Sequence, residues 1–212
     1  MKRTFDITFS LLGLVILFPF LLWIAWRIRQ EHGGPVFYRG LRTGLYGKEF
    51  RIFKFRTMVF DADKIGPSST ANEDPRITRV GKFIRKHKLD ELPQLFNVLL
   101  GQMSFVGPRP EVKRFTDMYS EEEKAILTVR PGITDWGSIW NCDEGTILAG
   151  AEDPDLAYME LIRPTKLKLQ LKYVREVSFL TDLKIILLTL LTIIQPANPT
   201  ILKIRKGLSE LN

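Results

Sequence analysis

The uncharged stretch "ITFSLLGLVILFPFLLWIAW", residues 7–26, decides the class of fold. It is long enough to cross the hydrocarbon core of a bilayer as a helix. Pro19 lies near its middle and favours a kink or a break, because proline lacks the amide hydrogen that a helix interior needs. Basic residues flank both ends, so the positive-inside rule assigns no direction: Lys2 and Arg3 precede the stretch, and Arg27 and Arg29 follow it.

Two structures therefore remain open for this N-terminal segment. One is a kinked helix that spans the bilayer. The other is a re-entrant helix, bent at Pro19, that enters and leaves on the same face; each half would reach about halfway into a hydrocarbon core of ~30 Å. Asp6 and Arg3, at the start of the segment, are expected at the level of the lipid headgroups.

The composition describes a single domain with appendages. The chain has 212 residues, of which 45% are hydrophobic and 26% charged, as in globular proteins. The net charge is 31 − 24 = +7, which favours an anionic partner such as lipid headgroups, phosphate-bearing substrates or nucleic acid. Cys142 is the only cysteine, which excludes an intrachain disulfide framework.

The remaining pattern predicts a predominantly helical α/β fold. Short extended segments are expected within residues 35–60, a polar loop over 61–79, and an interfacial or core helix in the apolar run 179–194. Residues 130–145 read as irregular, and residues 167–174 fit a strand by alternation as well as a helix. Other helices are expected over 80–89, 91–100, 111–130 with Ser120 as N-cap, and most of 153–175.

The stretch "HKLDELPQLFN", residues 87–97, places two carboxylates side by side at the start of a predicted helix. With Asp90 as N-cap and Pro93 in the first turn, the helix dipole would favour the ionised forms of Asp90 and Glu91. An anionic aspartate there could act as a nucleophile or a metal ligand. The alternative is a solvated cap that only stabilises the helix.

Cations near this pair in the sequence suit phosphate oxygens. Arg109 lies between two prolines, which restrict its backbone, and Lys54, Arg56 and Arg85 occur in neighbouring basic motifs. The alternative is a basic surface on anionic lipid. Arg42, in a glycine-rich turn over residues 39–48 without P-loop spacing, could also bind an anion. "DAD", residues 61–63, could hold a nucleotide-sugar metal, and His32 and His87 are not spaced as zinc ligands.

A long string, "EDPRITRVGKFIRKHKLDELPQLFNVLLGQMSFVGPRPE" at residues 73–111, closely resembles the monotopic phosphoglycosyl transferases among the bacterial sugar transferases. The resemblance continues in "KFRTM" (54–58), "VRPGIT" (129–134), the proline-broken N-terminal helix and "SFLTDLKIILLT" (178–189). It covers nearly the whole chain, and the length is that of the small, single-domain members.

The resemblance implies a reaction and a location. Such enzymes move a phosphosugar from a nucleoside diphosphate sugar, usually a UDP-sugar, to a polyprenyl phosphate such as undecaprenyl phosphate. UMP is released, and the reaction is the first membrane step of glycan and polysaccharide biosynthesis. The implied protein is monotopic in the bacterial inner membrane, with its catalytic domain on the cytoplasmic face. No nucleic-acid partner is expected, and a homo-oligomer is left open.

The resemblance also implies roles for individual residues. Asp90 is the expected nucleophile and Mg²⁺ ligand, and Glu91 assists proton handling or acceptor activation. Phosphate-binding cations of the family match Lys54, Arg85 and Arg109, with Arg42, Arg56 and Arg130 as further candidates. The family's N-terminal helix is re-entrant and bends at the proline that matches Pro19. The expected division is a hairpin over 1–32, a transferase domain with interfacial helices over 33–195, and a tail over 196–212.

Two departures from the family pattern bear on these expectations. Phe18 stands where many members have serine before the proline, so the bend lacks that hydroxyl. Asp135 replaces a glycine, and no Asn-Gly-Arg stretch follows it, which leaves the sugar and the nucleotide contacts open. Two other functions remain: a membrane-anchored basic binding module, and a conventional glycosyltransferase that uses "DAD".

Overall fold

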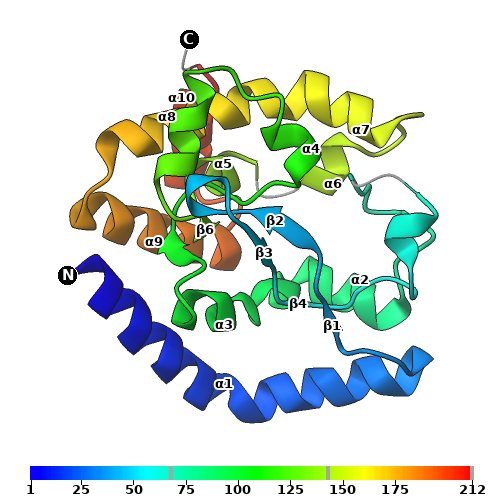
Figure 1. Ribbon diagram of the computed structural model, residues 1–212. Coiled ribbons are helices and arrows are strands. Elements are labelled where there is room, and N and C mark those ends of the chain that lie inside the picture. The colour runs from blue at the N-terminus through cyan, green and yellow to red at the C-terminus, as the bar shows by residue number, and fades with distance from the viewer. Residues whose placement is uncertain (67–68, 142–143, 211–212) are drawn as a thin grey trace.

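A 31-residue helix, α1 (Lys2–His32), begins the computed structural model, which describes residues 1–66, 69–141 and 144–210. Pro19 lies inside α1, and Figure 1 shows the helix changing direction near its middle as it runs along one side of the molecule. This helix is long and apolar enough to cross a membrane, and only 22% of its most apolar window is buried. A large apolar surface on α1 therefore faces outward.

The N-terminal end of α1 is tied to the rest of the chain by three charged residues. Arg3 donates to the carbonyl oxygens of Val98 and Leu99. Asp6 is only 2% exposed and accepts hydrogen bonds from the Ser104 hydroxyl and the Phe105 amide. Carbonyl acceptors of the domain thus hold Arg3, and donors of the domain hold Asp6. Their expected level at the lipid headgroups stays a prediction. Lys2 contacts Asp182, Tyr173 and the Val106 carbonyl.

The C-terminal end of α1 is held by the same domain. Both carboxylate oxygens of Glu31 accept hydrogen bonds from backbone amides, those of Arg79 at 2.8 Å and Val80 at 3.0 Å. These amides begin the helix α2 (Arg79–Lys86), so Glu31 satisfies donors that a helix start leaves free. Arg56 donates to the carbonyl of Gly33, directly after α1.

The described residues form three two-stranded sheets. Helices α2 and α3 (Gln94–Leu99) lie beside α1, and the other helices lie farther from it (Figure 1). The antiparallel pairs are β1 (Phe37–Tyr38) with β4 (Lys54–Phe55) and β2 (Leu41–Thr43) with β3 (Glu49–Arg51). The third pair, β5 (Ser104–Val106) with β6 (Gly132–Thr134), is parallel. The extended segments predicted within residues 35–60 are confirmed, whereas β6 lies in a region expected to be irregular.

The two helices expected over 80–89 and 91–100 are present as shorter elements, and the structure differs from the prediction at the carboxylate pair. After α2, a 3₁₀ turn η3 (Leu89–Glu91) precedes α3 (Gln94–Leu99). Pro93 is the N-cap of α3, so the assignment of Asp90 as that N-cap was wrong. Lys88 has a left-handed backbone with φ of 55°, which turns the chain before η3. Asp90 therefore lies within η3, ahead of α3.

The second half is helical with short interruptions. The helix expected over 111–130 is split. The Ser120 hydroxyl accepts from the Glu123 amide and Glu123 accepts from the Ser120 amide, which is the capping interaction predicted for Ser120, although the second part begins at Glu123 with Glu122 as its N-cap. Residues 167–174 form helix and not strand. The elements are η1 (Leu45–Gly47), η2 (Ala62–Lys64), α4 (Lys113–Thr116), η4 (Glu123–Thr128), α5 (Trp136–Trp140), α6 (Glu144–Ile147), α7 (Pro154–Ala157), η5 (Tyr158–Ile162), α8 (Arg163–Glu176), α9 (Phe179–Ile194) and α10 (Pro199–Ser209).

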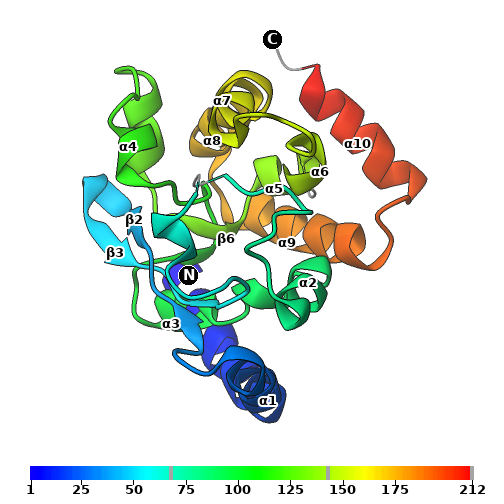
Figure 2. The same ribbon diagram turned by 90° about the vertical axis from the view of Figure 1, so that its right-hand side faces the viewer.

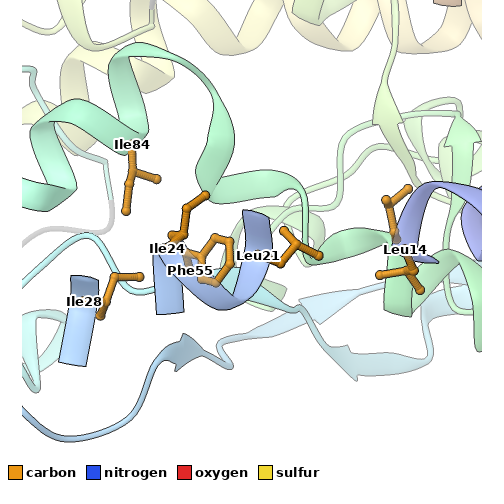
Figure 3. Close-up of a cluster of buried hydrophobic side chains, with 7 residues drawn as sticks. Leu14, Leu21, Ile24, Ile28, Phe55 and Ile84 are labelled. Atoms are coloured by element: carbon orange, nitrogen blue, oxygen red, sulfur yellow. The ribbon is translucent and has the colours of Figure 1, made fainter. Parts of the chain in front are cut away.

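One face of α1 is part of the hydrophobic core. Figure 3 shows this cluster, in which side chains of α1 meet Phe55 of β4 and Ile84 of α2. The α1 residues recur at helical spacing, which places them on one stripe: Leu14, Leu21, Ile24 and Ile28. The opposite stripe is exposed and includes Val15, Ile16, Trp23 and Trp26.

Helix α9 also divides into a buried and an exposed face. Ile185 is fully buried, while Leu180, Leu187 and Ile194 are 76%, 58% and 73% exposed. An apolar face of this kind fits the predicted interfacial helix. Helix α10 turns away from α9 by 120° and lies apart from α1 (Figure 2).

Candidate active site

The two carboxylates of η3 are brought together with a lysine and an arginine from distant parts of the chain. Nζ of Lys54, on β4, lies 2.9 Å from Oδ2 of Asp90 and 3.2 Å from Oε1 of Glu91. Arg109 forms a bidentate pair with Glu91, in which Nη1 donates to Oε2 at 3.0 Å and Nη2 donates to Oε1. Three of the predicted site elements therefore converge: the carboxylate pair, the "KFRTM" lysine and the "GPRP" arginine.

The four side chains are largely withdrawn from solvent but not closed off. Side-chain exposure is 8% for Asp90, 18% for Glu91, 26% for Lys54 and 34% for Arg109. The two cations carry most of the exposed surface, so they form the open side of the site. The greater exposure of Lys54 and Arg109 makes the solvent-facing side of the site positive, which favours anions.

The charged neighbours of Glu91 and Arg109 shift the pKa values of both groups. Burial alone would raise the pKa of Glu91, but Arg109 and Lys54 hold that pKa well below its usual range. Glu91, opposing the effect of burial, raises the pKa of Arg109. Glu91 is therefore an anion paired with a permanent cation, and it is poorly suited to accept a proton while Arg109 stays in place.

The loop that carries Arg109 is pressed against the strand pair β5–β6. A side chain at Gly107 would overlap the carbonyl of Arg130, and one at Gly132 would overlap the backbone of Gly107. Glycine is needed at both positions for this close approach. Pro108 and Pro110 restrict the backbone on each side of Arg109, as the sequence indicated.

The other predicted cations lie away from the carboxylates. Arg85 is half-buried on α2, and within the described ranges no hydrogen bond or ion pair joins it to Asp90 or Glu91. Arg56 is 8% exposed and serves the end of α1, and burial lowers its pKa despite the nearby Glu31. Arg42 donates to the Leu41 carbonyl and lies near the Tyr38 ring. Arg130 is exposed and donates to the Gly101 carbonyl.

The residues present are compatible with a magnesium ion, but only together with a substrate. Oδ1 of Asp90 makes no hydrogen bond within residues 1–66, 69–141 and 144–210, so one carboxylate oxygen can take a ligand. No group of three or more His, Cys, Asp or Glu residues in those ranges could hold a metal. Mg²⁺ is commonly held by one or two carboxylates with substrate phosphates completing its shell. Cys142 and the side chains of Asp63 and His32 lie outside the described residues.

Several buried polar residues beside the site were not predicted. Glu111 pairs with Lys166 at 2.9 Å and accepts from the hydroxyl of Tyr158 at 2.6 Å. Gln170 donates to the Arg109 carbonyl at 3.4 Å. Lys166 and Gln170 are four residues apart among leucines, and this spacing is the signal that both face inward from one helix.

A cation-fronted carboxylate pair beside an outward-facing apolar helix is suited to a protein that handles anionic groups at a membrane. The model of the family described as "Bacterial sugar transferase" matches residues 1–196, and the chain belongs to that family. The resemblance drawn from the sequence motifs is thereby confirmed.

Named relatives agree with this assignment. The chain is 38% identical over 195 residues to the UDP-glucose:undecaprenyl-phosphate glucose-1-phosphate transferase of Escherichia coli, covering 89% of this chain and 39% of that protein. It is 37% identical over 189 residues to the uncharacterized sugar transferase EpsL of Bacillus subtilis, covering 89% and 85%. A putative undecaprenyl-phosphate N-acetylgalactosaminyl 1-phosphate transferase of Bacillus subtilis is 47% identical over 121 residues, covering 57% and 68%. The chain thus spans well under half of the length of the Escherichia coli relative.

Proposed function

We propose that the protein transfers a sugar 1-phosphate from a UDP-sugar to undecaprenyl phosphate and releases UMP. The observation that carries this proposal is the convergence of Lys54 and Arg109 on the Asp90–Glu91 pair. Two anionic substrates must approach an anionic nucleophile, and fixed cations offset that repulsion without reorganising. The names of relatives that act on undecaprenyl phosphate support the substrate class.

Asp90 acts as the nucleophile in the proposed mechanism. A carboxylate oxygen of Asp90 attacks the phosphorus that bears the sugar, forming an acyl phosphate, and the bond from that phosphorus to UMP breaks. A phosphate oxygen of undecaprenyl phosphate then attacks the same phosphorus. The bond to Asp90 breaks, which regenerates the carboxylate and yields undecaprenyl diphosphate sugar. The covalent intermediate divides one difficult displacement into two.

The neighbouring groups have separate roles. Lys54 contacts Asp90 directly and would pass to the phosphate oxygens as the new bond forms, since its ammonium can serve either anion. Glu91 pairs with both terminal nitrogens of Arg109 and so keeps its guanidinium in one orientation at the entrance of the site. Arg85, which in the described part of the chain makes no hydrogen bond or ion pair with the carboxylates, would join only when the diphosphate is bound. Asp90 would hold Mg²⁺ through its remaining oxygen, and a bound Mg²⁺ would supply further charge neutralisation to the diphosphate.

The re-entrant topology is part of this proposal. Lys2 and Asp6 attach the start of α1 to the domain, and Glu31 attaches its end to the same domain. A helix that crosses the bilayer delivers its ends to opposite faces, about 30 Å apart. Attachment of both ends to one domain supports a helix that enters and leaves on a single face. In this proposal that face is the cytoplasmic face of the inner membrane, because the water-soluble nucleotide sugar is a cytoplasmic compound.

A panel of UDP-sugars tests the proposed activity. The purified protein is incubated with each UDP-sugar, with and without undecaprenyl phosphate, and UMP is measured. One or more sugars should release UMP and form a lipid-linked product, and isotope exchange between UMP and that UDP-sugar should occur without the lipid. Absence of turnover across the panel, or salt-sensitive nucleic-acid binding in its place, would contradict the proposal.

A further inference from the structure

Asp135 is a buried carboxylate that the proposed chemistry does not use. It is 1% exposed, and within the described residues no ion pair joins it to a basic side chain. Oδ1 accepts from the amide and the hydroxyl of Ser138, at 2.7 Å and 2.8 Å, and so caps α5. The family resemblance predicts glycine at this position. A buried charge is costly to maintain, so its second oxygen needs an explanation.

That second oxygen contacts the backbone of Arg109. The amide of Arg109 donates to Oδ2 of Asp135 at 3.2 Å. On the other side of the same residue, the Arg109 carbonyl accepts from Nε2 of Gln170 at 3.4 Å. Both backbone polar groups of Arg109 are therefore held by side chains, one at the start of α5 and one on α8, and neither belongs to a strand ladder.

Asp135 has two structural roles: it caps α5 and it accepts from the Arg109 amide. A neutral N-cap such as serine or asparagine would serve α5 through one oxygen. Only a residue with a second acceptor can cap α5 and hold the Arg109 amide together. The carboxylate also places a negative charge beside a loop whose guanidinium faces the mouth of the site.

We propose that Asp135 is a positioning residue, which with Gln170 fixes the Arg109 backbone so that the guanidinium meets Glu91 and the substrate phosphate in one orientation. This inference rests on the proposed function. A site that depends on a fixed fork is sensitive to small displacements, because a shift of about 1 Å can cost on the order of a hundredfold in rate. Glycine at position 135 would leave the loop held by Gln170 and the prolines alone.

A double-mutant cycle tests the inference. Asp135→Asn can still cap α5 with its amide oxygen but turns a donor toward the Arg109 amide. We expect it to lower kcat/KM for the UDP-sugar roughly tenfold. In an Arg109→Lys background the same change should cost less than about twofold, because the fork it positions is gone. Equal losses in both backgrounds, or full activity of Asp135→Asn, would overturn the inference.

Two further variants keep the test sharp. Ser138→Ala removes a contact from Oδ1 and leaves the Arg109 contact, so its activity should stay within about twofold of the wild type. Gln170→Met removes the donor to the Arg109 carbonyl. Oε1 of Gln170 is buried and has no hydrogen-bond partner among the residues that the structure describes, so the variant should fold. It should show the same dependence on Arg109, and it replaces Asp135→Asn in the cycle should that variant fail to fold.

A readout independent of activity separates the inference from the proposed function. Hydrogen–deuterium exchange of peptides covering residues 107–111 should be faster in Asp135→Asn than in Ser138→Ala, because the Arg109 amide loses its acceptor. Unchanged exchange would overturn the inference. A wild type that turns over no UDP-sugar would count against the proposed function alone, and the exchange result would still decide the role of Asp135.

Discussion

Nζ of Lys54 lies 2.9 Å from Oδ2 of Asp90, which pairs the proposed nucleophile with a cation before any substrate is bound. The same ammonium lies 3.2 Å from Oε1 of Glu91, so one lysine bridges both carboxylates. This contact holds the Asp90 carboxylate in one orientation. Its charge is balanced by a group that can shift to the phosphate as the acyl phosphate forms.

Replacing Asp90 by asparagine should abolish both transfer and UMP exchange. The amide keeps the shape of the side chain but lacks the nucleophilic oxygen, so the first displacement has no acceptor. UMP release and mass spectrometry of the intact protein measure the result, and a phosphosugar adduct on Asp90 is expected in the wild type only. Asp61→Asn is the matched control, because Asp61 pairs with the exposed Lys64 outside the site. Exchange at full rate in Asp90→Asn would exclude the proposed nucleophile.

Replacing Lys54 by methionine should lower kcat about 100- to 1,000-fold, the usual scale for loss of one preorganised stabilising group. Methionine keeps most of the side-chain volume, so the fold should persist. Lys48→Met, on an exposed turn of the same region, provides the comparison and should retain activity. Steady-state kinetics of UMP release measure both variants. Similar activity in the two would remove Lys54 from the mechanism.

Cysteines at both ends of α1 should be labelled from the same side of the membrane. Thr4 and Gln30 are exposed, so Thr4→Cys and Gln30→Cys in a Cys142→Ser background report the two ends. An impermeant maleimide applied to inside-out vesicles should label both, and neither should react in right-side-out vesicles. Labelling of the two positions from opposite faces would restore a spanning helix.

Breaking the buried pair between Glu111 and Lys166 should destabilise the fold. Glu111→Gln leaves the Lys166 ammonium buried without a counter-charge, which costs about 3 kcal/mol in the free energy of unfolding. The double variant Glu111→Gln with Lys166→Met should recover much of that loss, since no lone charge remains. Denaturant unfolding in detergent micelles measures the three proteins. Equal stability of the single variant and the wild type would contradict the expectation.

The same pair predicts a pH dependence of stability. Burial opposes ionisation of Glu111, but Lys166 and Tyr158 hold its folded-state pKa below the usual value. Its contribution is therefore complete above the unfolded pKa of about 4.3 and is lost as the pH falls through the lower folded value. The unfolding midpoint of the wild type should drop in acid more steeply than that of Glu111→Gln. Parallel acid profiles would show that Glu111 contributes nothing to this dependence.

The sequence predicts most of this fold where local signals are strong. The apolar run of α1, the extended segments before residue 60 and the Ser120 cap follow from periodicity and side-chain chemistry. Residues 130–145 were expected to be irregular because their turn-like residues dominate. The parallel pairing of β6 with β5 is a tertiary contact, and it depends on glycines that let two backbones approach.

The site divides in a similar way. Asp90, Glu91, Lys54 and Arg109 stand in sequence motifs and are found together. The burial of Asp6, the cap that Glu31 places on α2 and the grip on Arg109 could not be predicted. Each joins residues far apart in the chain through two hydrogen bonds, and no local pattern encodes such contacts.

The stripe of α1 that packs on Phe55 and Ile84 makes the proposed membrane helix part of the hydrophobic core. Removing α1 would expose the apolar side chains of Phe55 and Ile84 to solvent. A domain without α1 should therefore aggregate. An unrelated hydrophobic helix could restore membrane attachment but would not reproduce the stripe of Leu14, Leu21, Ile24 and Ile28. We therefore expect insertion of α1 into the bilayer and assembly of the site to be coupled steps of folding.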